Sequence, residues 1–366
     1  MRFSSHAPDR FLIFTIGSLL LIGLFMLASA SPIISYTKFH HPYHFLFHQI
    51  TFGLLPGIFL FFIGYKTDYH FWRKISFFFL LLTIFLLGAV FIPGIGASFG
   101  RARSWIKLGN FSFQPSELVK LSLIFYLSAL LSKTEKKIKD IKYGLLPFLL
   151  LIGLIFFLLY SQPDLGTLSI IIATSLIIYF VSGGKLTHIL GIILSGLLVV
   201  SFLLKKSSYQ MMRIKVFLNP DAYPKLSYHL RQALLSIGSG GLFGLGLGES
   251  RGKFAYVPEA YSDSIFSVIA EELGFFFSLF LVFLFVFFAL RGLRIAKRSP
   301  DKFGQLLAVG IVSWITVQAF VNIMSMINLV PMTGVPLPLI SYGGSALAVS
   351  LFALGILLNL SKYTRE

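Results

Sequence analysis

Apolar runs long enough to cross a lipid bilayer recur along the whole chain. The run 275–288, for example, contains only Phe, Leu and Val apart from one Ser. A transmembrane helix needs about 20 predominantly apolar residues. Runs of this kind lie at 11–30, 45–65, 75–95, 115–132, 143–160, 165–183, 187–204, 263–290, 304–328 and 341–361. The pattern predicts an all-α polytopic membrane protein of about ten transmembrane helices, which we expect to form a single domain, 1–366.

The composition excludes an ordinary soluble domain. Hydrophobic residues make up 56% of the chain and charged residues only 12%, whereas soluble domains contain about 25% charged residues. In so apolar a chain, the net charge of +17 points to an anionic membrane surface or a lipid head group rather than to nucleic acid. The absence of cysteine rules out disulfides and zinc–thiolate chemistry.

The distribution of lysine and arginine predicts how the helices are oriented. An even number of spans places both termini on one side, and most of the basic residues outside the longest connection lie on that side. Because cytoplasmic loops are enriched in Lys and Arg, we expect cytoplasmic termini. The longest connection, 205–262, then lies outside the membrane between the seventh and eighth helices. Its length and its many apolar residues predict a folded, functional loop.

Four carboxylates precede the apolar run that starts at residue 275. They are Glu259, Asp263, Glu271 and Glu272. If a helix starts at Asp263, Glu271 lies about 80° around it and Glu272 about 180° around it. We therefore expect Asp263 and Glu271 to face one cavity, with Asp263 near the outer water–lipid boundary. The alternative is that Ser262 or Asp263 only caps the helix.

Two further places put ionisable groups at membrane depth, where such groups are costly and mark a site or a pair. Glu117 and Lys120 are three residues apart and share a helix face. They form either a structural ion pair or part of a polar cavity. Asp164 starts a span, where it is either a helix cap or a site residue.

Arginines in the short outer loop could bind a phosphate. Arg101, Arg103 and Lys107 surround Trp105, a pattern that fits either interfacial anchors or phosphate ligands. Carboxylates and cations on one face suit a lipid-linked phosphate or pyrophosphate. The sequence has no arrangement typical of a Ser/His/Asp triad. We predict no metal site, although several histidines (His40, His41, His44, His48) gather in the first outer loop.

Six motifs, in order from about residue 95 to the end, resemble those of the SEDS family (shape, elongation, division and sporulation). The stretch 246–251 and the short spacing between Gly244 and Pro258 resemble the cell-division FtsW type more than the elongation RodA type. The motifs are Gln114-Pro-Ser-Glu-Leu-Val-Lys120, Gln162-Pro-Asp-Leu-Gly-Thr167, Ile237-Gly-Ser-Gly-Gly-Leu-Phe-Gly244, Pro258-Glu-Ala-Tyr-Ser-Asp263, Glu271-Glu-Leu-Gly274 and Pro336-Leu-Pro-Leu-Ile-Ser-Tyr-Gly-Gly-Ser345.

The resemblance implies a function. Family members polymerise lipid II into peptidoglycan strands outside the bacterial cytoplasmic membrane, together with a class B penicillin-binding transpeptidase and other division proteins. The family's catalytic aspartate falls on Asp263, which we expect to act as general base, and its loop arginine falls on Arg213. We expect Glu259 and Glu271 to raise the proton affinity of Asp263, and Arg213, with Arg103 as second choice, to stabilise the leaving pyrophosphate.

No cofactor is required by this reading. A divalent cation bridging Asp263 and the pyrophosphate is compatible with it, but no residue pattern indicates one. The chain departs from the family pattern next to the aspartate, where Tyr261, Ser262 and Ser264 replace His, Thr and Phe. The alternatives are a RodA-type elongation polymerase, a lipid II flippase that uses Glu117, Lys120 and Asp164 as a polar path, and a non-catalytic scaffold for a transpeptidase.

Overall fold

A computed structural model describes residues 6–99, 102–108, 111–134, 137–206, 208–252 and 257–364. Within these residues, eight helical segments are long and apolar enough to span a membrane. They are α1 (Arg10–Ala30), α3–η1–α4 (His44–Gln49, Ile50–Leu54, Leu55–Lys66), α5 (Tyr69–Ala89), α6 (Pro115–Lys133), η3–α7 (Ile141–Leu145, Leu146–Ser161), α12 (Ile265–Lys297), α13 (Lys302–Met326) and α14 (Gly344–Ser361).

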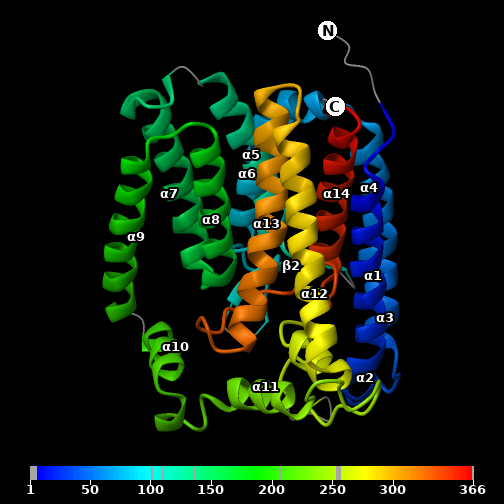
Figure 1. Cartoon of the computed structure of the whole chain (residues 1–366). Coiled ribbons are helices and arrows are strands. Elements are labelled where there is room, and N and C mark those ends of the chain that lie inside the picture. The colour runs from blue at the N-terminus through cyan, green and yellow to red at the C-terminus, as the bar shows by residue number, and fades with distance from the viewer. Residues whose placement is uncertain are drawn as a thin grey trace.

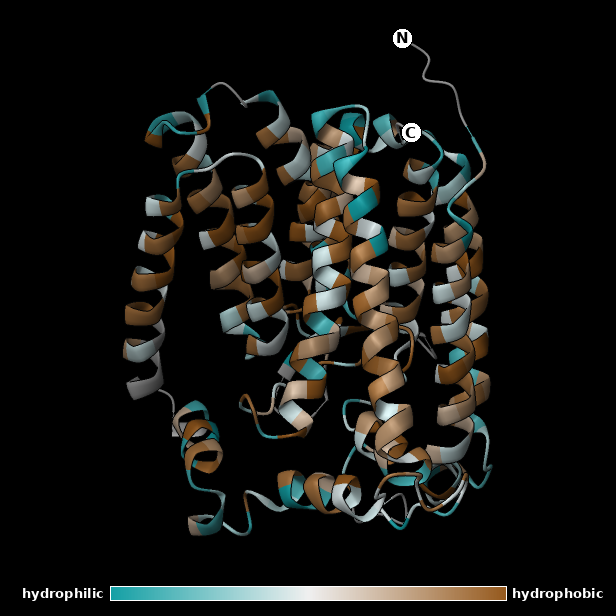
Figure 2. Cartoon of the chain, viewed as in Figure 1, coloured by the Kyte–Doolittle hydropathy of each residue, from teal (hydrophilic) through white to brown (hydrophobic). Residues whose placement is uncertain are grey.

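Two further apolar helices are α8 (Leu165–Val181) and α9 (Leu186–Lys206). Their apolar stretches within the described residues are Leu165–Val181 and Leu186–Val199. The predicted polytopic helical fold is confirmed, and a count of ten spans stays a prediction. Figure 2 shows apolar residues over the middle of the long helices and most polar residues toward the two ends of the molecule.

Three of the helices form the centre of the bundle. The apolar windows of α6, α13 and α14 are 78%, 78% and 89% buried, against 17–39% for the other spans. Small residues allow the closest approach, as between α4 and α14. A Cβ on Gly64 would lie 2.8 Å from the carbonyl oxygen of Phe352, and one on Gly355 would collide with the Phe61 carbonyl. Such glycine contacts let membrane helices pack backbone against backbone.

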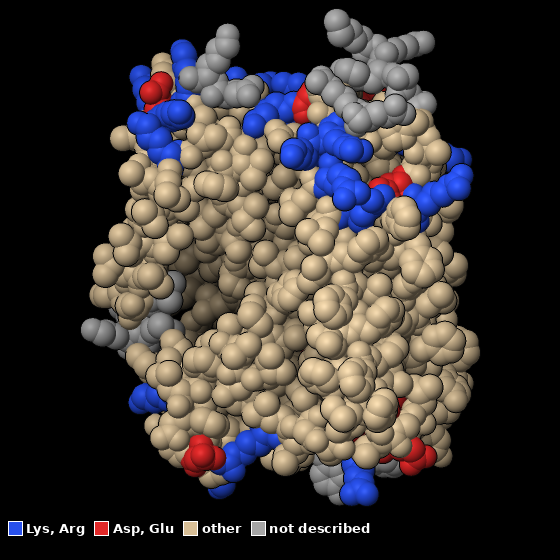
Figure 3. All heavy atoms as spheres, viewed as in Figure 1, with Lys and Arg blue, Asp and Glu red and all other residues tan. Residues whose placement is uncertain are grey.

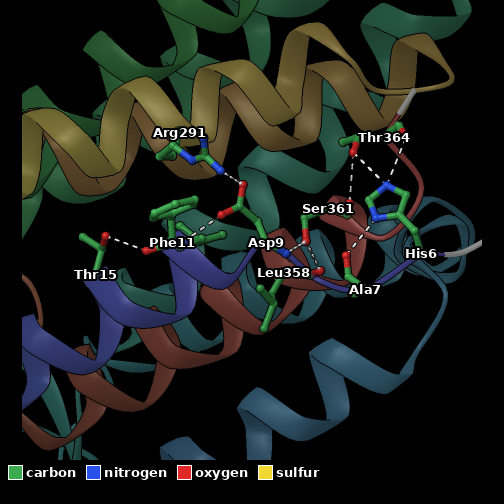
Figure 4. A network of polar contacts seen from close by, with 10 residues as sticks. His6, Ala7, Asp9, Phe11, Thr15, Arg291, Leu358, Ser361 and Thr364 are labelled. Atoms are coloured by element: carbon green, nitrogen blue, oxygen red, sulfur yellow. Dashed lines mark hydrogen bonds and ion pairs between the residues drawn. The ribbon is translucent and has the colours of Figure 1, made fainter. Parts of the chain in front are cut away.

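Both termini lie at the same end of the molecule (Figure 1), and lysine and arginine gather at this end (Figure 3). A polar network joins the two ends of the chain there (Figure 4). The Asp9 carboxylate caps α1 by accepting the Leu12 amide, and it forms an ion pair of 2.7 Å with Arg291 of α12. The Asp9 amide donates to the hydroxyl of Ser361 at the end of α14.

The shorter elements lie toward the middle of the molecule and at the end opposite the termini (Figure 1). They are α2 (Pro32–Phe39), β1 (Gly96–Phe99), β2 (Ala102–Leu108), β3 (Phe111–Phe113), α10 (Ser208–Leu218), η4 (Pro220–Ala222) and α11 (Tyr228–Ser239). The three strands form one antiparallel sheet in the order β1-β2-β3, which is a local exception to the all-α prediction. Helices α10 and α11 belong to the predicted 205–262 loop, which is folded as expected and runs along this end (Figure 1).

Helix α12 is interrupted near this end. Gly274 has φ of 77° and ψ of −173°, a conformation open to glycine and costly for other residues. The glycine-rich segment 240–246 fills the interruption. Its Leu245 and Gly246 amides donate to the carbonyls of Glu271 and Glu272 at 2.9 and 3.0 Å. The segment therefore completes the helix end and holds the acidic residues of α12 in place.

Candidate functional site

A polar cavity of about 240 Å³ lies among the helix ends and loops on the side away from the termini. The sheet, the first turns of α6 and α8, helix α10 and the connection from α13 to α14 all contribute to its wall. Its polar and aromatic lining includes Ser104, Trp105, Gln114, Glu117, Asp164, Arg213, Ser262, Thr333 and Tyr342. Segments that lie far apart in the sequence therefore build one site.

Asp263 adjoins this cavity from the turn before α12. Its neighbour Ser262 lines the cavity. A Cβ placed on the lining residue Gly334 would lie 3.6 Å from the Asp263 Oδ2 atom. The Oδ1 atom is buried and has no hydrogen-bond partner among the described residues. Oδ2, on the side of Gly334, is therefore the oxygen placed to accept a proton from a bound substrate.

The surroundings adjust the proton affinity of Asp263. Burial, and next the charge of Glu259, raise the pKa of the Asp263 carboxyl to about 7, while Arg213 acts in the opposite direction. Glu259 is exposed and has a φ of 49°. Its negative charge therefore acts on Asp263 although its side chain is not packed in the core. The effect of Glu259 on the pKa of Asp263 agrees with the prediction. Burial and this charge together yield a carboxylate that can take up and release a proton near neutral pH.

Glu117 and Lys120 form a buried ion pair that also reaches the cavity. The Lys120 Nζ atom lies 2.9 Å from Glu117 Oε1 and 2.8 Å from the amide oxygen of Gln318. Lys120 also lies over the Trp314 ring, 5.0 Å from its centre. The Glu117 Oε2 atom is buried without a hydrogen-bond partner among the described residues. The pair is thus a structural ion pair of which Glu117 lines the polar cavity and Lys120 the small space behind it, and a role in substrate binding stays a prediction.

Asp164 combines a structural role with a place in the cavity wall. Its Oδ1 accepts the Thr167 amide at 3.1 Å and caps α8. Its Oδ2 receives only long contacts, 3.4 Å from the Gln114 amide and 3.5 Å from the Ser116 hydroxyl. The cap was one of the two predicted roles, and the second oxygen stays available toward the cavity.

Glu271 is not part of this cavity, so the predicted pairing of Asp263 and Glu271 in one cavity is wrong. The Glu271 carboxylate accepts the hydroxyl of Ser250 at 2.6 Å and the amides of Arg251 and Gly252 at 2.9 to 3.3 Å. Predicted capping by residue 262 or 263 is also wrong, because the N-cap of α12 is Ser264 and forms no side-chain cap bond. Glu271 instead stabilises the fold of the outer loop.

Arg103 does not line the cavity either. Its guanidinium donates to the Ile92 carbonyl at 3.2 Å and lies beside Gly96 of β1, so it closes the hairpin. The next residues of the same strand, Ser104 and Trp105, line the cavity instead. Gln318, the partner of Lys120, is not ionisable and was not predicted as a site residue, although an amide inside an otherwise apolar helix is itself a signal of a polar contact.

A second cavity, of about 230 Å³, lies between α10, α11 and the segment that follows α13. Most of its lining is apolar: Met212, Val216, Phe217, Leu226, Leu230 and Met332. Arg213 lines both cavities, and its guanidinium donates to the Met332 carbonyl at 3.3 Å. Helix α10 thus places one cation between a polar and an apolar compartment.

No group of three or more His, Asp or Glu residues within the described ranges is arranged to hold a metal ion. A divalent cation that bridges Asp263 and a pyrophosphate therefore stays a prediction. The four outer-loop histidines make other contacts, such as the 3.0 Å contact between His48 and the Tyr342 hydroxyl.

Fold and site together define the class of protein: a polytopic membrane protein with a carboxylate-bearing polar cavity at the end opposite its termini. Within that class, the model of the FtsW, RodA and SpoVE family, described as "Cell cycle protein", matches residues 10–366. The chain belongs to this family.

Individual relatives are similar over almost their whole length. Stage V sporulation protein E of Bacillus subtilis is 41% identical over 98% of each chain. A probable peptidoglycan glycosyltransferase FtsW of Geobacter sp. is 38% identical over 94% of each chain. Among solved structures, a chain of a peptidoglycan synthase complex superposes with a TM-score of 0.80 at 26% identity, covering 97% of this chain and 98% of that one. Thermus thermophilus RodA gives 0.71 at 28% identity, over 98% of each.

Proposed function

We propose that the protein is a peptidoglycan glycosyltransferase that polymerises lipid II, in bacterial cell division. Membership of the family and the names of its FtsW relatives support this assignment. The structural observation that carries it is the Asp263 carboxylate next to the polar cavity, with its Oδ2 atom 3.6 Å from a Cβ placed on the lining residue Gly334. An elongation polymerase of the RodA type would perform the same chemistry, and the FtsW relatives favour the division role.

The proposed reaction is one displacement at the anomeric carbon of the donor. The acceptor sugar hydroxyl attacks this carbon and forms the new glycosidic bond, while the bond to the polyprenyl pyrophosphate breaks. The acceptor proton moves to Asp263, and the leaving group departs as the pyrophosphate anion. Because a single displacement inverts the anomeric centre, a product strand that retains the donor's configuration would contradict this mechanism.

Arg213 is the cation we assign to the pyrophosphate. Its guanidinium lines both cavities, so a phosphate beside it would direct the sugars into the polar cavity and the lipid tail toward the apolar one. Arginine binds phosphate oxygens through paired hydrogen bonds. Figure 3 shows the surface hollowed between the α9–α10 side and the α12–α13 side, with uncharged residues in the visible lining. A polyprenyl chain could reach the site through such an opening.

The distribution of charge supports a location in the cytoplasmic membrane with both termini in the cytoplasm. Lysine and arginine gather at the end that carries the termini (Figure 3), and cytoplasmic faces are enriched in these residues. The cavity then opens toward the outer face, where lipid II would be polymerised. We expect a class B penicillin-binding transpeptidase and other division proteins as partners. The similarity to a chain of a peptidoglycan synthase complex supports the first of these.

The departures from the family pattern do not leave Asp263 without support, which argues against a non-catalytic scaffold. The ring of Tyr261 stacks on Phe45 at 4.3 Å and lies 5.6 Å from the Tyr342 ring. Ser262 lines the cavity. Ser264 forms a 2.6 Å hydrogen bond with His229. Each replacement residue therefore has its own contact.

A flippase would need a continuous polar path past the Glu117–Lys120 pair. The space behind this pair, lined by Lys120, Thr174, Ser175 and Trp314, has a volume of only about 10 Å³. That is room for a single water at most, so this conformation favours surface chemistry over transport of a disaccharide head group.

The deciding experiment is glycan-strand synthesis from lipid II by protein reconstituted in vesicles, alone and with its cognate transpeptidase. We expect strands from the wild type and none from Asp263→Ala at equal folding. Equal synthesis by both proteins would support the polymerase assignment but contradict the role of Asp263 as general base. The absence of strands under every condition would overturn the polymerase assignment.

A further inference from the structure

The turn that carries Asp263 is held by three different elements. The Ser341 hydroxyl, from the segment before α14, donates to the Ser262 carbonyl at 2.6 Å. The Asn322 amide of α13 donates to the Asp263 carbonyl at 2.7 Å. His229 of α11 contacts the Ser264 hydroxyl at 2.6 Å. Ser262 is thus attached to the segment before α14, Asp263 to α13 and Ser264 to the outer helix α11.

The third attachment differs from the other two because it depends on a side chain of the turn. Backbone carbonyls accept the first two hydrogen bonds, and any residue offers a carbonyl. A serine at a helix N-cap normally directs its hydroxyl to the amides of the first turn. Ser264 occupies this position but forms no cap bond. Its hydroxyl is directed to His229 instead, so the helix gives up its cap for a contact with α11.

His229 is a suitable fixed partner. It is half-buried and lines the apolar cavity together with Arg213. Burial, and next the charge of Arg213, lower the pKa of His229 to about 4, against the opposing effect of a hydrogen bond with the Pro258 backbone. A neutral imidazole has one donor and one acceptor nitrogen. Nε2 lies 2.6 Å from the Ser264 hydroxyl and can exchange a hydrogen bond with it in either tautomer.

We propose that His229 is a positioning residue, which through Ser264 fixes the turn 262–264 and keeps the Asp263 carboxylate buried beside the cavity. The inference rests on the proposed function, because it assigns His229 to a catalytic Asp263. Without the bond, the attachments of the turn to other elements, within the part of the chain that the structure describes, are the two backbone ones, and Asp263 becomes more hydrated.

The first test compares two amides at position 229. A glutamine amide reaches approximately the position of Nε2, whereas an asparagine amide reaches only that of Nδ1. We expect His229→Asn, His229→Ala and Ser264→Ala to lower kcat for strand synthesis by about tenfold, within the range that a small misplacement costs. His229→Gln should restore most of the rate, with KM for lipid II unchanged throughout. Equal impairment of the Gln and Ala variants would overturn the proposal.

A double variant tests whether both residues act through one contact. His229→Ala with Ser264→Ala should be no slower than either single variant, since coupled residues give non-additive effects. A loss equal to the product of the single losses would overturn the proposal. His188→Ala is the matched control, because His188 is also half-buried and contacts a hydroxyl, that of Tyr179 at 2.9 Å, but lies at the start of α9. This variant should keep the wild-type rate.

A labelling measurement separates this inference from the proposed function. A hydrophobic carbodiimide modifies protonated carboxyl groups, and mass spectrometry of the Asp263 peptide reports its protonation at each pH without any turnover. The charged or titratable groups that act on Asp263 are Glu259, Tyr261 and Arg213. All three are unchanged in the variants. Labelling should fall off at lower pH in His229→Ala than in the wild type or His229→Gln.

The outcomes distinguish the two ideas. Strand synthesis that survives in Asp263→Ala would contradict the general-base role of Asp263. The labelling result would then still test whether His229 positions the turn 262–264. An unchanged labelling profile in His229→Ala would overturn the positioning role even if Asp263 proves essential. Thermal unfolding midpoints of all variants must stay comparable, and His229→Gln serves as the folded reference if His229→Ala does not fold.

Discussion

Two groups of acids in this protein have opposite environments. Around Glu271 and Glu272, donors surround the carboxylates: Ser250 and the amides of residues 251 and 252 on the first, Ser29 on the second. At Glu117 and Asp263, one oxygen of each carboxylate is buried without a partner among the described residues. Carboxylates saturated with donors hold the fold together, whereas those next to the polar cavity with one unsatisfied oxygen are the candidates for contact with substrate.

The sharpest test of this contrast is Asp263→Asn. General-base catalysis contributes about 10² to 10⁴-fold to a rate, so we expect strand synthesis to fall by at least about 100-fold. Stability should be unchanged or higher, because the substitution removes a charge whose Oδ1 has no partner. Vesicle assays and thermal unfolding measure the two quantities. A folded Asp263→Asn protein with wild-type activity would contradict the contrast.

The next largest effect is expected at Glu117. Glu117→Gln leaves Lys120 as a buried charge without its counterion, which costs about 3 kcal/mol in free energy of unfolding, and should also reduce activity. Adding Lys120→Met should recover the stability but not the activity, because the carboxylate of Glu117, a residue that lines the cavity, is still missing. Denaturant titration and strand synthesis separate the two effects. Full activity in the double variant would make the pair purely structural.

The pH dependence should follow Asp263. With its pKa raised to about 7, the rate should fall about tenfold per pH unit on the acid side. In the unfolded chain the carboxyl titrates near 3.8, so the folded protein binds more protons between about pH 4 and 7 and its stability falls as pH rises through this window. Rate profiles and thermal midpoints from pH 5 to 9 measure both slopes. Their absence would contradict a buried, functional Asp263.

Glu271→Gln should reduce stability more than activity, the reverse of Asp263→Asn. Loss of charge-assisted hydrogen bonds costs about 1.5–3 kcal/mol each, so the free energy of unfolding should fall, and activity should decrease only with the folded fraction. The corresponding measurements are the thermal midpoint and the activity per folded molecule. A stable Glu271→Gln protein without activity would place Glu271 in the chemistry after all.

The smallest effect is expected at Arg103. This prediction extends to the cations the contrast between residues bound within the fold and residues at the cavity. Arg103→Ala should change the rate of strand synthesis by no more than about twofold, as for surface changes away from functional contacts. Its guanidinium contacts the Ile92 carbonyl rather than the cavity. Arg213→Ala, at the boundary of both cavities, is the matched comparison and should be clearly slower. Equal losses in both variants would make Arg103 a phosphate ligand.

The failed prediction at Glu271 has a specific cause. The angle between Asp263 and Glu271 was derived for a helix that starts at Asp263, but α12 starts at Ile265 and Asp263 lies in the preceding turn. The helical period therefore does not relate the two side chains. Arg103 was misplaced because the all-α prediction contained no strand here, whereas β2 pairs with β1 and the Arg103 side chain donates to the Ile92 carbonyl.

The sequence by itself determined the membrane class, the approximate spans, the shared side of the termini and the short set of candidate acids. These follow from local quantities, namely the length of apolar runs and the placement of charge. Only the tertiary structure decided which carboxylate oxygens are satisfied. Their partners come from distant segments, as with Glu272 and Ser29, 243 residues apart, or Lys120 and Gln318, 198 apart. Hydrogen-bond partners across such distances depend on how helices pack, and no local pattern encodes them.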